Sequence, residues 1–247
     1  MTSDTSAPIL IFGGAGGIGC ALARRLRSAG QPVAITSRSG ERAHAIGAET
    51  GAVALVCDVL DPDSIRSACA AAAHNGRLGG VVYAVGSMPL KPLAHTSAED
   101  MLMAYRINVV GAFVAVQASA EALKAASGSV VLFSSVAAAQ GFANHASIGA
   151  AKAAVEGLTL SLAAELAPAV RVNAIAPSLT VTPLAAPLTV NPIVADGIAK
   201  LHPIARLGTA GEMAALAQFL LSADAGWITG QIIGVDGGRS SLRVGKS

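Results

Sequence analysis

Short apolar runs alternate with longer stretches of helical pattern from one end of the chain to the other. The short runs have the length and character of buried strands, and they predict strands at Ile9–Phe12, Pro32–Thr36, Val53–Cys57, Gly80–Tyr83, Ser129–Ser134, Val170–Ala174 and Gln231–Val235. The stretches between them predict helices at Ile18–Ser28, Arg42–Glu49, Asp63–Ala73, Glu99–Ala125, Ala146–Leu166 and Glu212–Ser222. No internal repeat or linker interrupts the alternation, so we expect one domain spanning residues 1–247.

This alternation predicts an α/β fold with a doubly wound parallel sheet of about seven strands and helices on both faces, because right-handed crossovers place the helices there. Composition agrees with this fold class. Of the 247 residues, 53% are hydrophobic and only 13% are charged, which favours a sheet covered on both faces over a sheet with one face in water.

One segment, residues 177–209, departs from the rhythm. It is rich in proline, has one short helical pattern near Val190–Leu201, and lies between the sixth and seventh predicted strands. An insertion at this place lies over the carboxyl edge of a parallel sheet, where ligands bind. We interpret it as a substrate lid, and the alternative is a surface excursion without a role.

Charge and cysteine usage exclude several classes. Seventeen basic and fifteen acidic side chains are scattered along the chain, so we expect no nucleic-acid partner and no membrane partner. The uncharged stretches Ala125–Ala151 and Val172–Ala195 are interrupted by polar residues, glycine or proline, and the N-terminal sequence lacks the basic region of a signal peptide. Cys20, Cys57 and Cys69 have no metal-ligand spacing and are interpreted as core residues of a cytoplasmic protein without a metal.

A glycine-rich loop follows the first predicted strand and opens the first predicted helix. In the sequence ILIFGGAGGIG, the residues Gly13, Gly17 and Gly19 have the spacing G-x3-G-x-G, with Ile18 between the last two. Such glycines allow a tight turn, close approach of a pyrophosphate, and close packing of the helix, whose N-terminal N–H groups bind phosphate. The loop therefore predicts a dinucleotide site.

The end of the second predicted strand favours NADP over NAD. An NAD site usually has an acidic residue there for the ribose 2′-hydroxyl, whereas this chain has Ser37 and Arg38, with Arg42 one helical turn on. A guanidinium attracts a 2′-phosphate. NAD stays possible, and the alternative role for Arg38 is stacking on adenine.

Two further strand ends offer cofactor contacts. Asp58 and Val59 follow the third strand, where the Asp58 carboxylate would accept a hydrogen bond from the adenine amino group. The alternative is that Asp58 caps the next helix, a role that Asp61 would fill equally well. Gly86 follows the fourth strand, where the backbone can approach the cofactor.

These residues, together with several further short motifs, give the sequence a resemblance to the short-chain dehydrogenase/reductase family. The matching pieces are GGAGGIG, CDV, RINVVGAF, VVLFSSVA, Lys152, VRVNAIAPSLTVTPL and GQIIGVDGG, in the family's order. The resemblance implies a single Rossmann-like domain, assembly as a homotetramer or homodimer, and transfer of a hydride between NAD(P)(H) and an alcohol or carbonyl.

The resemblance also implies roles for single residues. Ser135 would hydrogen-bond the substrate oxygen, Lys152 would hold the nicotinamide ribose and lower the pKa of the catalytic acid, and Asn108 would anchor a water in the proton relay. Pro177 and Thr182 would flank the nicotinamide. Two departures from the family pattern are Ser178, where a glycine is usual, and YAVG at residues 83–86, where NNAG is usual.

The most serious departure is Ile148. In the family, the catalytic tyrosine stands four residues before the lysine, at the position of Ile148. Isoleucine donates no proton, and general acid catalysis contributes roughly 10²–10⁴-fold to a rate. Either another group replaces the tyrosine, or the chain has lost turnover.

His145 is the candidate replacement. It lies seven residues before Lys152, on nearly the same helical face and about 10 Å away along the axis, and imidazole serves as acid or base near neutral pH. Enoyl reductases of the same superfamily place their tyrosine at this offset. The alternative is that His145 caps the helix or packs beneath the lid.

Two functions remain open from the sequence. The first is an NADP(H)-dependent oxidoreductase for a small hydrophobic carbonyl, alcohol or activated alkene, with a non-standard proton donor. The second is a catalytically silent nucleotide-binding protein that acts as a sensor or a partner subunit. The retained Ser135 and Asn108 favour the enzyme. Non-redox lyase chemistry on the same fold usually abandons the glycine-rich loop, which this chain retains.

Overall fold

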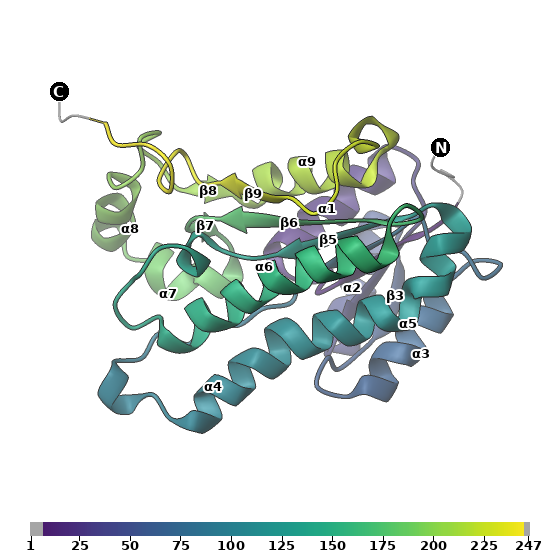
Figure 1. The fold of residues 1–247 in the computed structure, drawn as a ribbon, viewed down its shortest axis with the longest axis horizontal. Coiled ribbons are helices and arrows are strands. Elements are labelled where there is room, and N and C mark those ends of the chain that lie inside the picture. Colours follow the sequence, from purple (N-terminus) through teal and green to yellow (C-terminus); the bar gives the residue numbers. More distant parts are fainter. Residues whose placement is uncertain (1–6, 245–247) are drawn as a thin grey trace.

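In the computed structural model, which describes residues 7–244, seven parallel strands form one sheet in the order β3-β2-β1-β4-β5-β6-β9 (Figure 1). The strands are β1 (Ile9–Phe12), β2 (Val33–Ser37), β3 (Val53–Val56), β4 (Gly80–Tyr83), β5 (Ser129–Phe133), β6 (Arg171–Pro177) and β9 (Ile232–Val235). The predicted α/β fold with its parallel sheet of seven strands is confirmed. The predicted bounds of β1 and β4 are those observed; the other strand ends differ by up to three residues.

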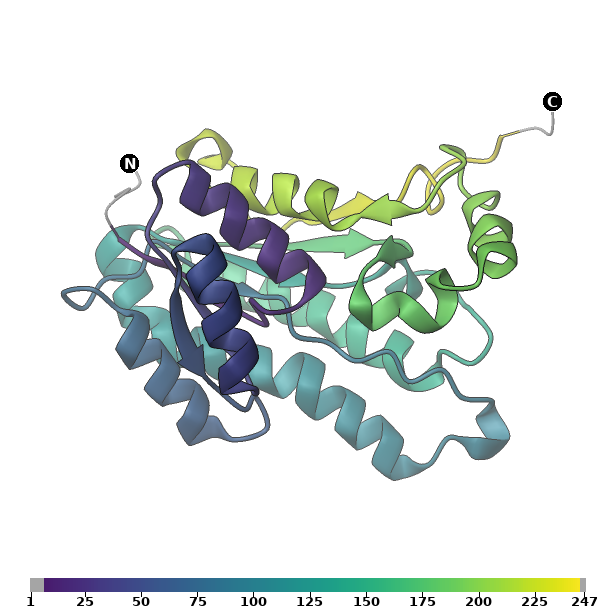
Figure 2. The ribbon, with the colours of Figure 1, turned by 180° about the vertical axis from the view of Figure 1, so that it is seen from behind.

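Helices cover both faces of the sheet (Figures 1 and 2). One apolar core lies between the sheet and α1 (Gly17–Ser28), α2 (Gly40–Thr50) and α9 (Ala210–Leu221). A second core lies on the other face, beneath α3 (Pro62–Ala72), α5 (Gly111–Ala126) and α6 (Ala146–Leu166). Because both faces are covered, the central strands β1, β4 and β5 are buried at every position.

The strand order reverses next to β1, and this reversal positions the site. β1 pairs with β2 on one side and with β4 on the other, with Phe12 opposite Tyr83 at the carboxyl end. The chain leaves β1 toward one face and β4 toward the other, which opens a crevice at the carboxyl ends of these strands. The glycine-rich loop begins in this crevice.

The structure corrects the prediction of one uninterrupted helix at Glu99–Ala125. The segment consists of α4 (Ala98–Tyr105), a π-helical turn η2 (Arg106–Val110) and α5. A π turn inserts an extra residue into the helix and often marks a functional position; here it includes the buried Asn108. The whole segment Ala98–Ala126 is long and apolar enough to cross a membrane by length and composition, but α4 and α5 pack along α6 and α3 as part of the layer over the sheet.

The segment predicted as a lid is closed at its base by a second, two-stranded sheet, which the sequence did not predict. β7 (Thr180–Val181) pairs in parallel with β8 (Gly208–Thr209). Between them lie η4 (Pro183–Ala185), α7 (Ala186–Thr189) and α8 (Pro192–Ala199), so the helix predicted near Val190–Leu201 is shorter than expected. Proline at the start of η4, α7 and α8 explains these short elements, because it begins helices readily and interrupts them elsewhere.

Tyr83 and Gly111 form a close contact that holds the π turn against the sheet. The Tyr83 hydroxyl, buried at the end of β4, donates to the carbonyl of Ile107 at 2.6 Å. The ring therefore occupies the place where a side chain on Gly111 would stand, and a Cβ there would collide with the Tyr83 hydroxyl and approach its Cζ to 3.1 Å. This bond connects the sheet to the π turn. It lies at residues 83–86, where this chain has YAVG in place of the usual NNAG and so lacks its asparagine.

Gly111→Ala is expected to destabilise the protein by about 2 kcal/mol, because overpacking of a buried contact costs roughly 1–3 kcal/mol. Urea unfolding measures the change. The matched control is Gly157→Ala in α6, where a Cβ meets nothing within 4 Å; this change should be neutral or stabilising, as for an exposed helical glycine. In a Tyr83→Phe background the penalty of Gly111→Ala should shrink. Equal penalties in both backgrounds would show that the hydroxyl does not cause the strain.

Candidate active site

A cavity of about 480 Å³ lies at the carboxyl ends of β1, β2 and β4. The predicted residues that line it are Gly13, Gly17, Ile18, Ser37, Arg38, Gly86 and Thr182. Ala15, Gly16, Ser39, Arg42, Ala84, Val85, Pro183 and Leu184 complete the lining. The glycine-rich loop, the end of the second strand and the start of the lid segment thus meet around one space.

The glycines of the loop are required by close backbone contacts. Gly13 has a φ of +77°, and a Cβ there would lie 2.9 Å from the Ala84 carbonyl oxygen. A Cβ on Gly17 would lie 2.9 Å from Cβ of Thr182, and one on Gly19 would collide with the carbonyl of Gly13. Helix α1 begins at this loop with Gly16 as its N-cap, without a side-chain cap and without an acidic residue in its first turn. Its N–H groups thus remain available to phosphate, and the loop fits a dinucleotide.

Two arginines border the same cavity. Arg38 lies directly after β2 and is exposed, and no hydrogen bond or ion pair is formed by its side chain among residues 7–244. Arg42, in the first turn of α2, donates from Nη2 to the Ala15 carbonyl at 3.3 Å. Ser39 caps α2 by accepting from the Arg42 N–H at 3.2 Å, so the loop between the arginines has a fixed path. Arg42, which the sequence places one helical turn after Arg38, thus borders the same cavity.

Lys152, Asn108 and Gly86 come together behind this cavity. The point at which a Cβ on Gly86 would stand lies 3.3 Å from Asn108 Oδ1 and 3.6 Å from Lys152 Nζ. The Asn108 amide nitrogen donates to Ser87 Oγ and to the Ala104 carbonyl. Its Oδ1, by contrast, is buried without a partner among the described residues. A buried acceptor without a donor is costly, and this one fits a water in the predicted relay.

The ammonium group of Lys152 is buried rather than extended to solvent. Its Nζ donates to the Phe133 carbonyl at the end of β5, at 2.8 Å. Burial lowers the pKa of Lys152 from 10.5 to about 8, because desolvation disfavours the charged form. A lysine on an apolar helix can extend its ammonium group to solvent, and Lys152 does not.

A second cavity of about 240 Å³ adjoins the first, and Ile18, Thr182 and Leu184 line both. Predicted site residues Ser135, His145, Pro177 and Thr182 border it, together with Ser178 and Arg239. Ser135 caps η3 (Val136–Ala138) by accepting from the Ala137 N–H at 3.1 Å. The lid segment contributes Leu184, Ala185, Leu188 and Ile198. This lining identifies the second cavity as the candidate substrate site.

His145 faces this cavity and does not cap the helix. It stands at the N-cap position of α6, but its side chain makes no capping hydrogen bond. Its Nδ1 lies 2.7 Å from the Ala143 carbonyl. A carbonyl oxygen only accepts, so Nδ1 holds the hydrogen, and Nε2 is the nitrogen left for a ligand. The ring packs against Phe142, with 5.4 Å between centroids.

Ile148 is packed away from both cavities. Its side chain on α6 is only 5% exposed, and it borders neither cavity. Asp58 and Val59 also lie outside both linings. The Asp58 carboxylate accepts from the Leu60 N–H at 3.0 Å, while Asp61 caps α3; a contact of Asp58 or Val59 with the cofactor stays a prediction.

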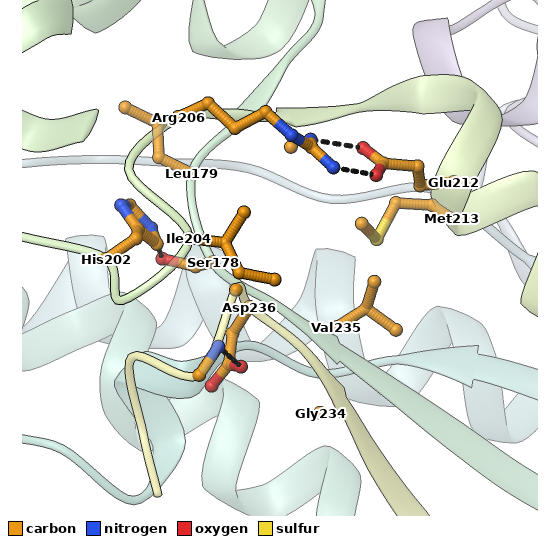
Figure 3. A pocket seen from close by; sticks show the side chains of 13 residues that line it. Ser178, Leu179, His202, Ile204, Arg206, Glu212, Met213, Gly234, Val235 and Asp236 are labelled. Atoms are coloured by element: carbon orange, nitrogen blue, oxygen red, sulfur yellow. Dashed lines mark hydrogen bonds and ion pairs between the residues drawn. The ribbon is translucent and has the colours of Figure 1, made fainter. Parts of the chain in front are cut away.

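Sequence reasoning missed a polar contact at Ser178 and His202. His202 was assigned no role, yet it is only 5% exposed. Its Nε2 lies 2.8 Å from Ser178 Oγ, and its Nδ1 faces the carbonyls of Ile198 and Ala199. The two side chains border a third cavity, of about 280 Å³, in which Arg206 and Glu212 form an ion pair (Figure 3). Ser178 in place of the usual glycine was the available signal.

Known proteins resemble this chain over nearly its whole length. A family model described as Enoyl-(Acyl carrier protein) reductase matches residues 13–240. The 3-oxoacyl-[acyl-carrier-protein] reductase MabA of Mycobacterium tuberculosis is 34% identical over 235 residues, covering 94% of this chain and 92% of the relative.

Solved structures agree with the sequence relatives. A short-chain type dehydrogenase/reductase from Mycobacterium ulcerans has a TM-score of 0.89 and 33% identity, covering 98% of this chain and 92% of its own. A variant of actinorhodin polyketide ketoreductase, solved with NADPH, has a TM-score of 0.90 and 27% identity, covering 98% and 100% of the two chains.

The lowered pKa of Lys152 predicts a pH-dependent contribution to stability. Between about pH 8 and pH 10.5 the unfolded chain holds a proton on Lys152 that the folded chain has released. The free energy of unfolding therefore rises with pH across this window, by up to about 3 kcal/mol from this group.

Urea unfolding of wild type and Lys152→Met, compared across the same pH range, isolates that contribution. Cys57 and Tyr83, whose pKa values are raised by burial, oppose the rise equally in both proteins and cancel in the difference. The stability of wild type should improve relative to the variant as pH rises. Parallel curves would mean that Lys152 keeps its ordinary pKa.

Proposed function

Because this chain belongs to the short-chain dehydrogenase/reductase family of oxidoreductases, we propose that it is an NADP(H)-dependent member with a non-standard proton donor. Its substrate is a small hydrophobic carbonyl, alcohol or activated alkene. The observation that carries the proposal is the shared lining of the two cavities: the dinucleotide cavity and the substrate cavity meet at Ile18, Thr182 and Leu184. We expect the protein in the cytoplasm, as a homodimer or homotetramer.

NADP is favoured by the two arginines at the end of β2. Both side chains border the cofactor cavity, and Arg38 is free of protein partners among the described residues. A guanidinium pairs well with a phosphate, and the neighbouring Ser37 supplies a further hydroxyl. Gly13, Gly17 and Gly86 allow the approach of the dinucleotide, and the bound nicotinamide supplies or accepts the hydride.

His145 is the proposed proton donor. Ser135 Oγ would hydrogen-bond the substrate oxygen in the same cavity that His145 borders. With its Nδ1–H held by the Ala143 carbonyl, the imidazole presents Nε2 to the substrate; when protonated there, it donates to the oxygen that gains negative charge during reduction. Lys152 and Asn108 would hold a relay water between them, and the positive charge of Lys152 would favour the developing anion.

Ile148 supports the alternative function, a nucleotide-binding protein without turnover. A buried isoleucine at the family's tyrosine position removes the usual acid while leaving the cofactor cavity intact. In this case His145 would only pack on Phe142, and the protein would act as a sensor or a partner subunit.

The test follows NADPH oxidation with a panel of ketones and enones. Wild type is expected to turn over, and His145→Gln should lower kcat by about 10²–10⁴-fold, the usual contribution of a general acid. The matched control is His44→Gln, since His44 Nδ1 makes the same kind of contact, 2.7 Å from the Gly40 carbonyl, but outside the cavity; it should leave kcat unchanged.

Ile148→Tyr distinguishes the two functions, provided that circular dichroism shows it to be folded. If wild type is silent and Ile148→Tyr is active, the cofactor site is intact and the acid is lost, and the silent binder is the correct function. Equal activity of wild type and His145→Gln would exclude His145 as the donor.

Arg38→Gln is expected to weaken NADPH binding by about tenfold or more, through loss of a charge-assisted contact to the 2′-phosphate. NADH binding should change little, because NADH lacks this phosphate. Isothermal titration calorimetry measures the affinities for NADPH and NADH. The control is Arg66→Gln, because Arg66 is an exposed arginine that pairs with Asp63 outside the cavity. An equal loss for both cofactors would indicate stacking on adenine instead.

A further inference from the structure

Arg239 brings a fixed positive charge to the candidate substrate cavity. It follows β9 in the C-terminal loop and borders the cavity together with Phe142 and Ser178. Its Cζ lies 4.8 Å from the centroid of the Phe142 ring, and its Nη1 donates to Ser178 Oγ at 3.4 Å. Because Phe142 and Ser178 both line the cavity, these two contacts place the guanidinium at the cavity wall.

Asp236 acts on this guanidinium only through its charge and forms no ion pair with it. Arg239 forms no ion pair among residues 7–244. The nearest acid in sequence, Asp236, has its carboxylate occupied by the N–H groups of Gly238 and Ser240 and by the Ser240 hydroxyl. Partial burial lowers the pKa of Arg239, since desolvation disfavours its charge. The guanidinium is therefore held at the cavity wall by a ring contact and a neutral hydroxyl, and not by an ion pair.

A chain of hydrogen bonds orients Arg239 from the lid side. His202 Nδ1 faces the carbonyls of Ile198 and Ala199, so this nitrogen holds the hydrogen and Nε2 accepts from the Ser178 hydroxyl at 2.8 Å. The Ser178 oxygen then has its lone pairs free to accept from Arg239. The donor and acceptor in each of these hydrogen bonds are consistent with a guanidinium as the last donor. The hydrogen bonds connect α8 of the lid segment with the C-terminal loop.

The rest of the wall is mostly apolar, with Met88, Val136, Phe142, Leu179, Leu184 and Leu188 among its residues. Arg239 is the only permanently charged side chain that borders this cavity in the described part of the chain; His145 is charged only when protonated. In such surroundings a guanidinium pairs strongly with a planar oxyanion. A volume of about 240 Å³ suits a carboxylate, the smallest such group, on a short carbon chain.

We propose that the substrate is a small oxo acid, or the corresponding hydroxy acid, whose carboxylate pairs with Arg239 while its carbonyl lies at Ser135. This inference rests on the proposed function and narrows the substrate class from hydrophobic carbonyl compounds to those with one carboxylate. Arg239 is then the residue that determines specificity, and the chain through Ser178 and His202 positions it.

Calorimetry tests the pairing without requiring turnover. The protein is saturated with NADP⁺ and titrated with 4-oxopentanoate, 5-oxohexanoate and the methyl ester of each, so that every acid has a neutral partner of nearly the same shape. Wild type should bind at least one acid about tenfold or more tightly than its ester, as expected for a charge-assisted pair. Arg239→Met and Arg239→Gln should reduce this ratio to about one, while Arg239→Lys should retain part of it.

Arg206→Met is the matched control, because Arg206 borders only the neighbouring cavity and is already paired with Glu212 at 2.6 Å; its ratio should equal that of wild type. The inference is overturned if the esters bind as tightly as the acids, if the preference survives Arg239→Met, or if no acid of the series binds. Turnover of the acids, of their esters and of neutral ketones with NADPH is measured in parallel. Turnover without a preference for acids would overturn the inference and leave the proposed function standing, whereas a binding preference without turnover of any of these compounds would remove the function and leave Arg239 as a carboxylate-binding residue.

Discussion

Burial of the Lys152 ammonium group is the constraint on which the site depends. A lysine inside an apolar layer needs an acceptor, and β5 supplies one in the Phe133 carbonyl. The space beside the ammonium group is open because Gly86 has no side chain. The π turn brings the Asn108 amide to the same point. The Tyr83 hydroxyl holds this turn in place. Sheet, π turn and α6 are thus fixed relative to one another by polar contacts of buried groups, and the dinucleotide cavity opens directly beside them.

The sequence predicted those parts that depend on local pattern. Apolar periodicity predicted the seven strands, and the spacing of Gly13, Gly17 and Gly19 between a predicted strand and a predicted helix indicated the turn at the end of β1. Only the contact of Gly19 lies within the loop, whereas Gly13 and Gly17 approach the distant residues Ala84 and Thr182. The resemblance placed Ser135 and His145, which border one cavity, and Asn108 and Lys152, which lie behind the other.

What the sequence missed depends on contacts between distant segments. Ser178 and His202 are 24 residues apart, and Ser178 and Arg239 are 61 apart; no periodicity connects such positions. The π turn at Arg106–Val110 continues the apolar pattern of the helices on either side of it, so the sequence pattern does not distinguish it from an ordinary helix. The β7–β8 pair is two residues long on each side, too short to produce a recognisable strand signal. The signal available for the first of these contacts was Ser178, a polar residue in an apolar region, since burial requires such a residue to have a partner.

The short β7–β8 pair has a consequence for which parts of this chain can tolerate changes in length. By joining the two ends of the lid segment, it turns the residues between Thr180 and Thr209 into a closed loop that leaves and re-enters the fold at one place. The cost of closing such a loop grows only slowly with its length. Insertions, deletions or replacement of α7 and α8 can therefore accumulate without disturbing the register of the seven-stranded sheet. The part of the segment beyond Leu184 can thus change its contribution to the substrate cavity, while Thr182, Pro183 and Leu184 at its start keep their place beside the nucleotide cavity.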